Sequence, residues 1–188
     1  MDWHYIIKLI RSRPTFCQEL VPTKPVYQGF VNACKWGVGG VWFSGTEPLQ
    51  PIVWFQKWPE HIQNRLITDD NPYGDITIAE LELMGVFIQW IILEQCTTPD
   101  KLHCNSVAIW CDNLPAVAWL YKVQNSSSKW ASHILRALAI QLQHFRAALP
   151  AIDHLSGLFN IMSDFASREH TTHPNDFLTL FTSTLFFF

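Results

Sequence analysis

The stretch YQGFVNACKWGVGGVWFS, residues 27–44, decides how the sheet of this chain begins. Tyr27–Ala33 is rich in apolar and β-forming residues and predicts a strand. Lys35–Gly40 holds three glycines, which can adopt positive φ angles, and predicts a tight turn. Val41–Ser44 then returns as a second strand. The stretch therefore predicts an antiparallel hairpin.

Apolar runs and turn signals on the C-terminal side predict the remaining elements. These are a strand at Pro51–Phe55, a polar loop at 56–76, a helix from Ala79 to Gln95 with Thr77 as N-cap, a strand at Ser106–Cys111, and helices at Asn113–Tyr121 and Trp130–Ala147, followed by a strand at Leu149–Leu155 and a helix from Asn160 to Ser167. Three meandering strands followed by helix–strand crossovers predict an α/β fold. We expect a five-stranded mixed sheet, its first three strands antiparallel, with helices on both faces.

Length and composition favour one domain with its own core. The chain has 188 residues, 48% of them hydrophobic and 15% charged. We expect a linker or the end of a preceding domain at 1–25, the α/β domain at 26–170 and an apolar tail at 171–188. The net charge of −3 excludes a strong basic field, so any nucleic-acid binding would need local contacts or a tethered domain.

The cysteines and apolar runs favour an intracellular protein, cytoplasmic or nuclear. The five cysteines form an odd number with no CxxC pair, which is typical of reduced thiols rather than disulfides or a zinc finger. The apolar runs near 86–93 and 178–188 are too short to span a bilayer.

Four segments each contribute one oxygen-bearing side chain, in chain order Asn32, Glu82 (or Glu80), Asp112 and Asp164. Asn32 and Asp112 fall near the ends of two predicted strands. If those strands are neighbours, both side chains emerge at one sheet edge, where α/β proteins bind ligands. Converging carboxylates repel one another unless a divalent cation neutralises them. The pattern therefore indicates a metal site.

The choice between Glu80 and Glu82 depends on helix geometry. Two positions apart on a helix correspond to about 200°, so the two carboxylates cannot share a face. Glu82 shares its face with Gly85, which would let the helix approach the sheet closely. We favour Glu82 as the site residue. Glu80 is the alternative, and the other glutamate would then be an ordinary acid of the first helical turn.

The four segments together resemble the ribonuclease H domain of retrotransposon reverse transcriptases. The resemblance covers roughly residues 28–168 and rests on Val31-Asn32-Ala33-Cys34 with Gly37-Val38-Gly39-Gly40, Glu80-Leu81-Glu82-Leu83-Met84-Gly85, Trp110-Cys111-Asp112-Asn113, and His154-Leu155-Ser156-Gly157 with Asn160 and Ser163-Asp164-Phe165-Ala166-Ser167-Arg168. Each motif alone is weak, but the four in this order are specific.

The resemblance implies an endonuclease that hydrolyses RNA in RNA/DNA hybrids. It implies two Mg²⁺ ions, or Mn²⁺, held by Asn32, Glu82, Asp112 and Asp164. The counterpart of His154 is a mobile proton carrier. Expected partners are the hybrid and a polymerase domain in cis, with no membrane. Candidate contacts to the nucleic-acid backbone are Lys35, Gly37, Asn113, Asn125 and Lys129.

Asn32 departs from the family, which has aspartate at this position. An amide removes one negative charge from a site for two dications, so we expect impaired activity. The alternative is a catalytically inactive, connection-type module that binds nucleic acid or protein. The other positions also have structural explanations, with Asp112 as a helix N-cap, Asp164 as a surface acid and His154 as a loop residue.

Overall fold

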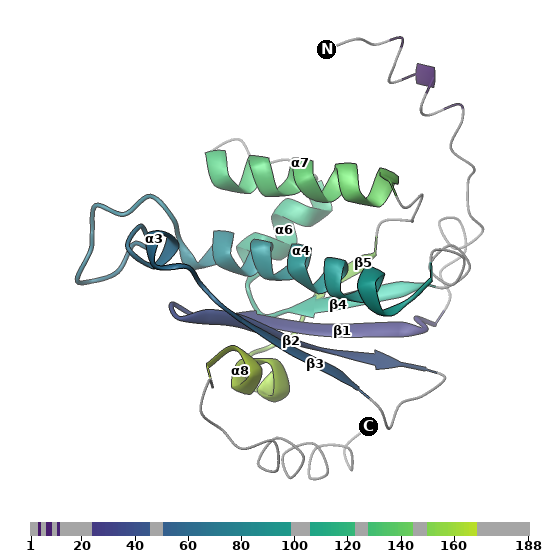
Figure 1. The fold of residues 1–188 in the computed structure, drawn as a ribbon, viewed down its shortest axis with the longest axis horizontal. Helices are drawn as coiled ribbons and strands as arrows, with labels where there is room; N and C mark the ends of the chain where they lie inside the picture. The colour runs from purple at the N-terminus through teal and green to yellow at the C-terminus, as the bar shows by residue number, and fades with distance from the viewer. Residues whose placement is uncertain are drawn as a thin grey trace.

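In the computed structural model, five strands form one mixed sheet (Figure 1). The strands are β1 (Tyr27–Ala33), β2 (Gly37–Ser44), β3 (Ile52–Lys57), β4 (Val107–Cys111) and β5 (Ala151–His154). Their order is β3-β2-β1-β4-β5, with β1, β2 and β3 antiparallel and with β4 parallel to both β1 and β5. The predicted α/β class and sheet type are confirmed.

The helices cover both faces of this sheet, as predicted. They are α3 (Glu60–Gln63), α4 (Ile78–Cys96), α6 (Leu114–Lys122), α7 (Lys129–His144) and α8 (Ile161–Arg168). Figure 1 shows α4, α6 and α7 on one side of the strands and α8 on the other. The short α8 packs mainly on β1 and β2, whereas α4 packs on the opposite face of the same strands.

The structure describes residues 24–45, 51–98, 106–122, 128–144 and 150–168, with His4, Ile7, Lys8 and Arg11 as isolated positions. Most of the predicted linker at 1–25, all of the predicted tail at 171–188 and the end of the predicted helix at Trp130–Ala147 lie outside the described residues. Within the described part of the chain, no helix combines the length and the apolar character needed to cross a membrane.

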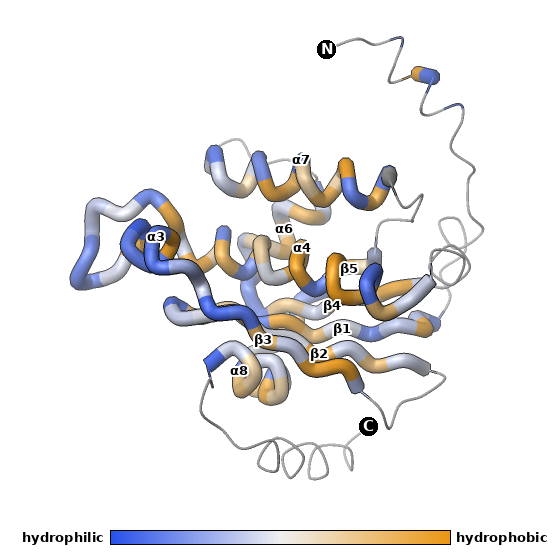
Figure 2. Tube along the Cα trace, viewed as in Figure 1, coloured by the Kyte–Doolittle hydropathy of each residue, from blue (hydrophilic) through white to orange (hydrophobic). Residues whose placement is uncertain are grey.

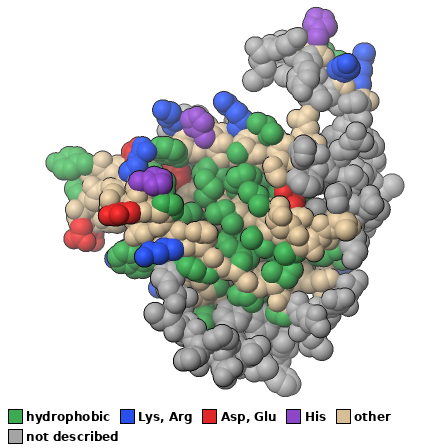
Figure 3. Space-filling model, viewed as in Figure 1, with side chains coloured by type: hydrophobic (Ala, Val, Ile, Leu, Met, Phe, Trp, Pro, Cys, Tyr) green, Lys and Arg blue, Asp and Glu red, His purple; other side chains and the backbone are tan. Residues whose placement is uncertain are grey.

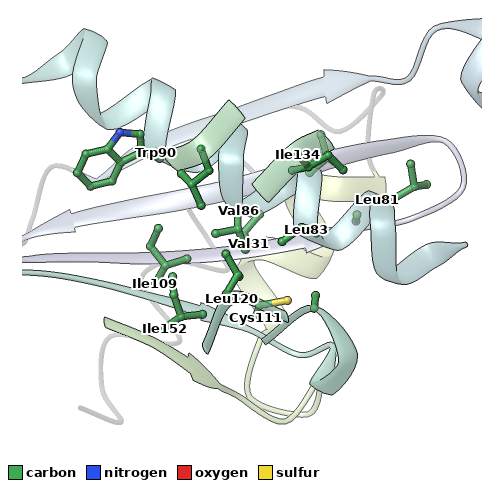
Figure 4. Packing of buried hydrophobic residues seen from close by; sticks show 14 of the residues in the cluster. Val31, Leu81, Leu83, Val86, Trp90, Ile109, Cys111, Leu120, Ile134 and Ile152 are labelled. Atoms are coloured by element: carbon green, nitrogen blue, oxygen red, sulfur yellow. The ribbon is translucent and has the colours of Figure 1, made fainter. Parts of the chain in front are cut away.

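The core lies mainly between the sheet and the layer formed by α4, α6 and α7. Figure 4 shows side chains from both layers meeting there. The fully buried members include Val31 and Ile109 from the strands, and Leu83, Val86 and Trp90 from α4. The buried side chains shared by α4 and the strands therefore hold α4 against the sheet. Figure 2 shows that the C-terminal half of α4 is mostly hydrophobic, whereas the segment around α3 is hydrophilic.

The predicted turn at Lys35–Gly40 is wrong in its second half. The reversal occupies Cys34–Trp36, where the Cys34 N–H donates to the Gly37 carbonyl at 2.8 Å, and β2 already begins at Gly37. The glycines have a packing reason, because a Cβ at Gly39 would lie 2.6 Å from the Ser167 nitrogen of α8. Gly40, on the α4 side, would overlap the Gln89 side chain.

The segment 56–76 is more ordered than the predicted polar loop. β3 continues to Lys57, and α3 follows it. Beyond α3, the Ile67 N–H donates to the Ile76 carbonyl at 2.8 Å, and an exposed ion pair joins Arg65 to Asp75. Ile76, at the end of this segment, is buried and packs in the core, so it holds the otherwise polar segment against the domain.

Replacing Gly39 by alanine tests the close approach of α8. We expect Gly39→Ala to lower the free energy of unfolding by about 1–3 kcal/mol, because the added methyl group overlaps helix backbone. The measurement is urea denaturation followed by circular dichroism. The control is Gly45→Ala, whose Cβ would meet nothing nearer than the Val26 carbonyl oxygen at 3.3 Å. Equal losses in both variants would contradict the packing role of Gly39.

Candidate metal site at the sheet edge

Two neighbouring strands deliver the first pair of predicted site residues. β1 and β4 run parallel, and Val31 pairs with Cys111 in their register. Asn32 and Asp112 each follow that pair by one residue, so they leave the sheet at the same edge. Glu82 reaches this edge from α4, and Asp164 reaches it from α8. The structure therefore brings the four predicted positions together.

Glu82 is buried between α4 and the ends of β1 and β4. Its Oε1 accepts the Ala33 N–H at 2.9 Å, and its Oε2 lies 3.6 Å from the Cys111 thiol. Burial raises the pKa of Glu82 to about 8, and the nearby Asp112 and Asp164 charges add to this rise. The Ala33 N–H acts in the opposite direction. Without a cation, this edge therefore favours a protonated Glu82.

Glu80 has a separate structural task at the start of α4. Its carboxylate accepts the Thr77 N–H at 2.5 Å and also contacts the Thr77 hydroxyl, completing a capping box. The predicted N-cap is thus confirmed. The helix turns Glu80 away from the direction that carries Glu82 to the sheet edge, in agreement with the expected angle between them.

Asp164 forms hydrogen bonds and an ion pair with groups of the chain itself. Its Oδ1 accepts the Asn32 Nδ2–H at 2.7 Å and the Arg168 Nε–H at 2.8 Å. Asn32 also donates to the Ser167 hydroxyl at 3.2 Å, and it is only 4% exposed. The amide at position 32 therefore acts here as a hydrogen-bond donor, which an ionised aspartate cannot do.

Asp112 lies at the open side of the edge. Burial raises its pKa, and the Asp164 charge adds to the rise, while His154 and Arg168 lower it. Its side chain is close to the loop before α8, because a Cβ on Gly157 would lie 3.2 Å from Asp112 Oδ2. Half-buried and near Glu82, Asp112 can offer a carboxylate oxygen to an ion.

Three of the side chains at this edge could hold a metal ion. The ligand atoms of Glu82, Cys111 and Asp112 all lie within 4.8 Å of one another. Sequence reasoning did not single out Cys111 as a ligand. Its position at the end of a buried strand, directly before Asp112, is the signal that would have identified it.

The predicted substrate contacts have different surroundings. Asn113 accepts the Ala116 N–H at 3.0 Å and caps α6, which gives it, and not Asp112, the N-cap role. Gly37 belongs to β2 instead of a turn, so its backbone faces Lys57 in the ladder. Lys35 Nζ lies 4.6 Å from the Trp36 ring. Lys129 is exposed at the start of α7.

The remaining two predicted residues differ in what the structure describes. His154 ends β5, and its exposed Nε2 lies 3.1 Å from the Asp112 carbonyl oxygen. It therefore stands beside the candidate site. Asn125 lies outside the described residues.

No protein-family model matches the chain, and no curated protein matches it.

The raised pKa of Glu82 predicts how stability changes with pH when chelator is present. The folded-state pKa of about 8 exceeds the ordinary value of 4.5, so the folded chain binds this proton more tightly. The resulting stabilisation is fully present below about pH 4.5 and is lost as the pH rises to about 8. We expect the free energy of unfolding to fall by a few kcal/mol over this range relative to Glu82→Gln.

Urea denaturation at several pH values measures this difference. Glu60→Gln is the control, since Glu60 is exposed at the start of α3 and should leave the profile unchanged. Parallel pH profiles for the wild type and Glu82→Gln would contradict the assignment.

Proposed function

We propose that this chain is a ribonuclease H-like domain of a retroelement reverse transcriptase, with RNA hydrolysis in RNA/DNA hybrids strongly reduced by Asn32. One observation carries the proposal, namely the meeting of Asn32, Glu82, Asp112 and Asp164 at one edge of the mixed sheet. Metal-dependent nucleases need several oxygen ligands at one point. The proposal implies an intracellular location, cytoplasmic or nuclear.

The chemistry of the donors fits divalent cations. Glu82, Asp112 and Asp164 would hold two Mg²⁺ ions, or Mn²⁺, and Asn32 would add a neutral carbonyl oxygen. When bound, such a pair supplies an activated water and stabilises the leaving oxygen of a phosphodiester. Burial raises the pKa of Glu82 to about 8 when no cation is bound. A cation beside the carboxylate would offset the cost of burying its negative charge.

The contacts of Asn32 support a loss of activity. Asn32 Nδ2–H and Arg168 Nε–H both donate to Asp164 Oδ1. A cation at Asp164 would have to displace these donors or share the carboxylate with them. The site with Asn32 also carries one negative charge fewer than it would with an aspartate at position 32. Both effects weaken cation binding at this side of the site.

Substrate binding would depend on local contacts and tethering. Lys and Arg side chains lie in separate places on the face shown in Figure 3, and the chain carries a net charge of −3. We propose that a polymerase domain in cis supplies the hybrid at high effective concentration. Lys35 and Lys129 would contact its phosphates, while the exposed His154 beside Asp112 would carry protons.

A second candidate function is a non-catalytic module of the same fold that binds nucleic acid or a protein partner. The observation that favours it is the Asn32–Asp164–Arg168 network, which balances the Asp164 charge without any ion. In this case the sheet edge would serve stability, and the domain would act by binding alone.

Restoring the acid at position 32 tests the proposed function. We expect Asn32→Asp to increase Mn²⁺- or Mg²⁺-dependent hybrid cleavage by about 100-fold or more, because it returns a charged ligand to the site. Cleavage of a labelled RNA/DNA hybrid measures the gain. The matched control is Asn32→Asp combined with Asp112→Asn, which should abolish it. No cleavage by a folded Asn32→Asp variant would reject the catalytic assignment.

Calorimetric titration with Mg²⁺ separates the two candidate functions. The catalytic proposal predicts that Asn32→Asp binds Mg²⁺ more tightly than the wild type does, because the variant adds one carboxylate. The non-catalytic alternative predicts hybrid binding without measurable Mg²⁺ binding in either protein. Tight binding of two Mg²⁺ ions by the wild type would reject that alternative.

A further inference from the structure

We propose that Cys111 makes this edge a mixed sulfur–oxygen site, which holds a single zinc-like dication through Glu82, Cys111 and Asp112. The inference rests on the metal site of the proposed function and replaces its two Mg²⁺ ions, in the wild-type chain with Asn32, by one ion of another class; it does not depend on hybrid cleavage. It states which class of cation the wild-type chain prefers, namely Zn²⁺, Co²⁺ or Cd²⁺ over Mg²⁺.

The separation of the donor atoms already matches tetrahedral coordination. Zinc bonds of about 2.3 Å to sulfur and about 2.0 Å to oxygen place the two ligand atoms about 3.5 Å apart at the tetrahedral angle. The Glu82 Oε2 to Cys111 Sγ distance is 3.6 Å. An oxygen of Asp112 lies within 4.8 Å of the Cys111 sulfur and of a Glu82 carboxylate oxygen. A small movement of the half-buried Asp112 would complete a three-ligand set.

Neighbouring groups orient the two buried ligands. The Ala33 N–H holds Glu82 Oε1 at 2.9 Å, which leaves Oε2 directed at the thiol. Burial and the Glu82 carboxylate raise the pKa of the Cys111 thiol, whereas the Asn113 N–H, which donates to Cys111 Sγ at 3.4 Å, acts in the opposite direction. Asn113 is itself held as the cap of α6. The site is therefore supported from β1 and from the start of α6.

Charge favours the same side of the edge. Asp164 Oδ1 already accepts from Asn32 and forms an ion pair with Arg168, whereas Glu82 accepts only a backbone N–H and lies against the Cys111 thiol. On binding, the Cys111 S–H bond breaks and Glu82 gives up the proton it carries without a cation; both protons pass to solvent as metal–sulfur and metal–oxygen bonds form. The thiolate then supplies the third negative charge that Asn32 does not provide.

Ligand type determines which ions benefit from this arrangement. Thiolate suits zinc-like ions, whereas Mg²⁺ requires oxygen ligands in near-octahedral geometry and retains its waters. The open side at Asp112 leaves room for a water as the fourth ligand. A strong preference for Zn²⁺ or Co²⁺ over Mg²⁺ therefore follows from the residues present.

Titration of the full chain with Co²⁺ tests the proposal. We expect a thiolate-to-cobalt charge-transfer band that saturates at one ion per chain, disappears on adding Zn²⁺ and persists in excess Mg²⁺. Cys111→Ser should abolish the band and weaken Zn²⁺ binding by at least about 100-fold. The matched control is Cys34→Ser, because the Cys34 thiol donates to the Ser167 carbonyl oxygen at 3.1 Å and lies outside the ligand set.

A variant with serine at Cys17, Cys34, Cys96 and Cys104 keeps the test decisive if Cys111→Ser does not fold. Cys111 is then the only thiol of the chain, and the band must persist. Absence of the band in the wild type, or its survival in folded Cys111→Ser, would overturn the proposal. These spectra are independent of catalysis, so failure of Asn32→Asp to cleave a hybrid would reject the proposed enzyme and leave the thiolate ligand standing.

Discussion

The parallel pairing of β1 with β4 is the constraint on which the candidate site depends. It sets Val31 opposite Cys111, so the next residues, Asn32 and Asp112, emerge side by side. Gly39 and Gly40 of β2 then allow α8 and α4 to approach the sheet from opposite faces. Each helix thereby brings one acidic residue to the edge that the strands have already defined.

The carboxylates brought together at this edge repel one another, and two different arrangements reduce that repulsion. On the α8 side, Asp164 is balanced by donors of the chain, Asn32 and Arg168. On the α4 side, Glu82 is buried with one backbone donor, and its pKa rises to about 8. A proton and a cation thus compete for the same carboxylate, as at other sites where metal binding displaces protons.

The sequence was sufficient wherever local chemistry and tertiary packing agree. β1 has the predicted bounds, Thr77 caps α4, and helix geometry separates Glu82 from Glu80. It was insufficient where contacts distant in the chain decide. The glycines of β2 indicate a turn locally, whereas α8, more than a hundred residues later, requires a glycine at position 39 within a strand.

The site itself shows the same limit. The sequence pattern identifies the four site positions, but it does not identify the group to which each side chain is hydrogen-bonded. The sequence identifies Asn32 as an amide that lacks a charge; only the fold shows that its Nδ2 donates to Asp164 Oδ1 at 2.7 Å. Likewise, the sequence places Cys111 directly before Asp112, but only the fold shows that Glu82 Oε2 lies 3.6 Å from its sulfur.

Asn32 consequently stabilises the packing of α8 while it weakens the site for cations. Two ionised aspartates at positions 32 and 164 would repel each other in the absence of metal. The amide converts that repulsion into a hydrogen bond, and Asn160 adds a buried bond of 3.0 Å to the Val31 carbonyl. These bonds attach α8 and the residue before it to β1 through groups of the chain itself. Any affinity for metal then depends chiefly on the residues of α4 and β4.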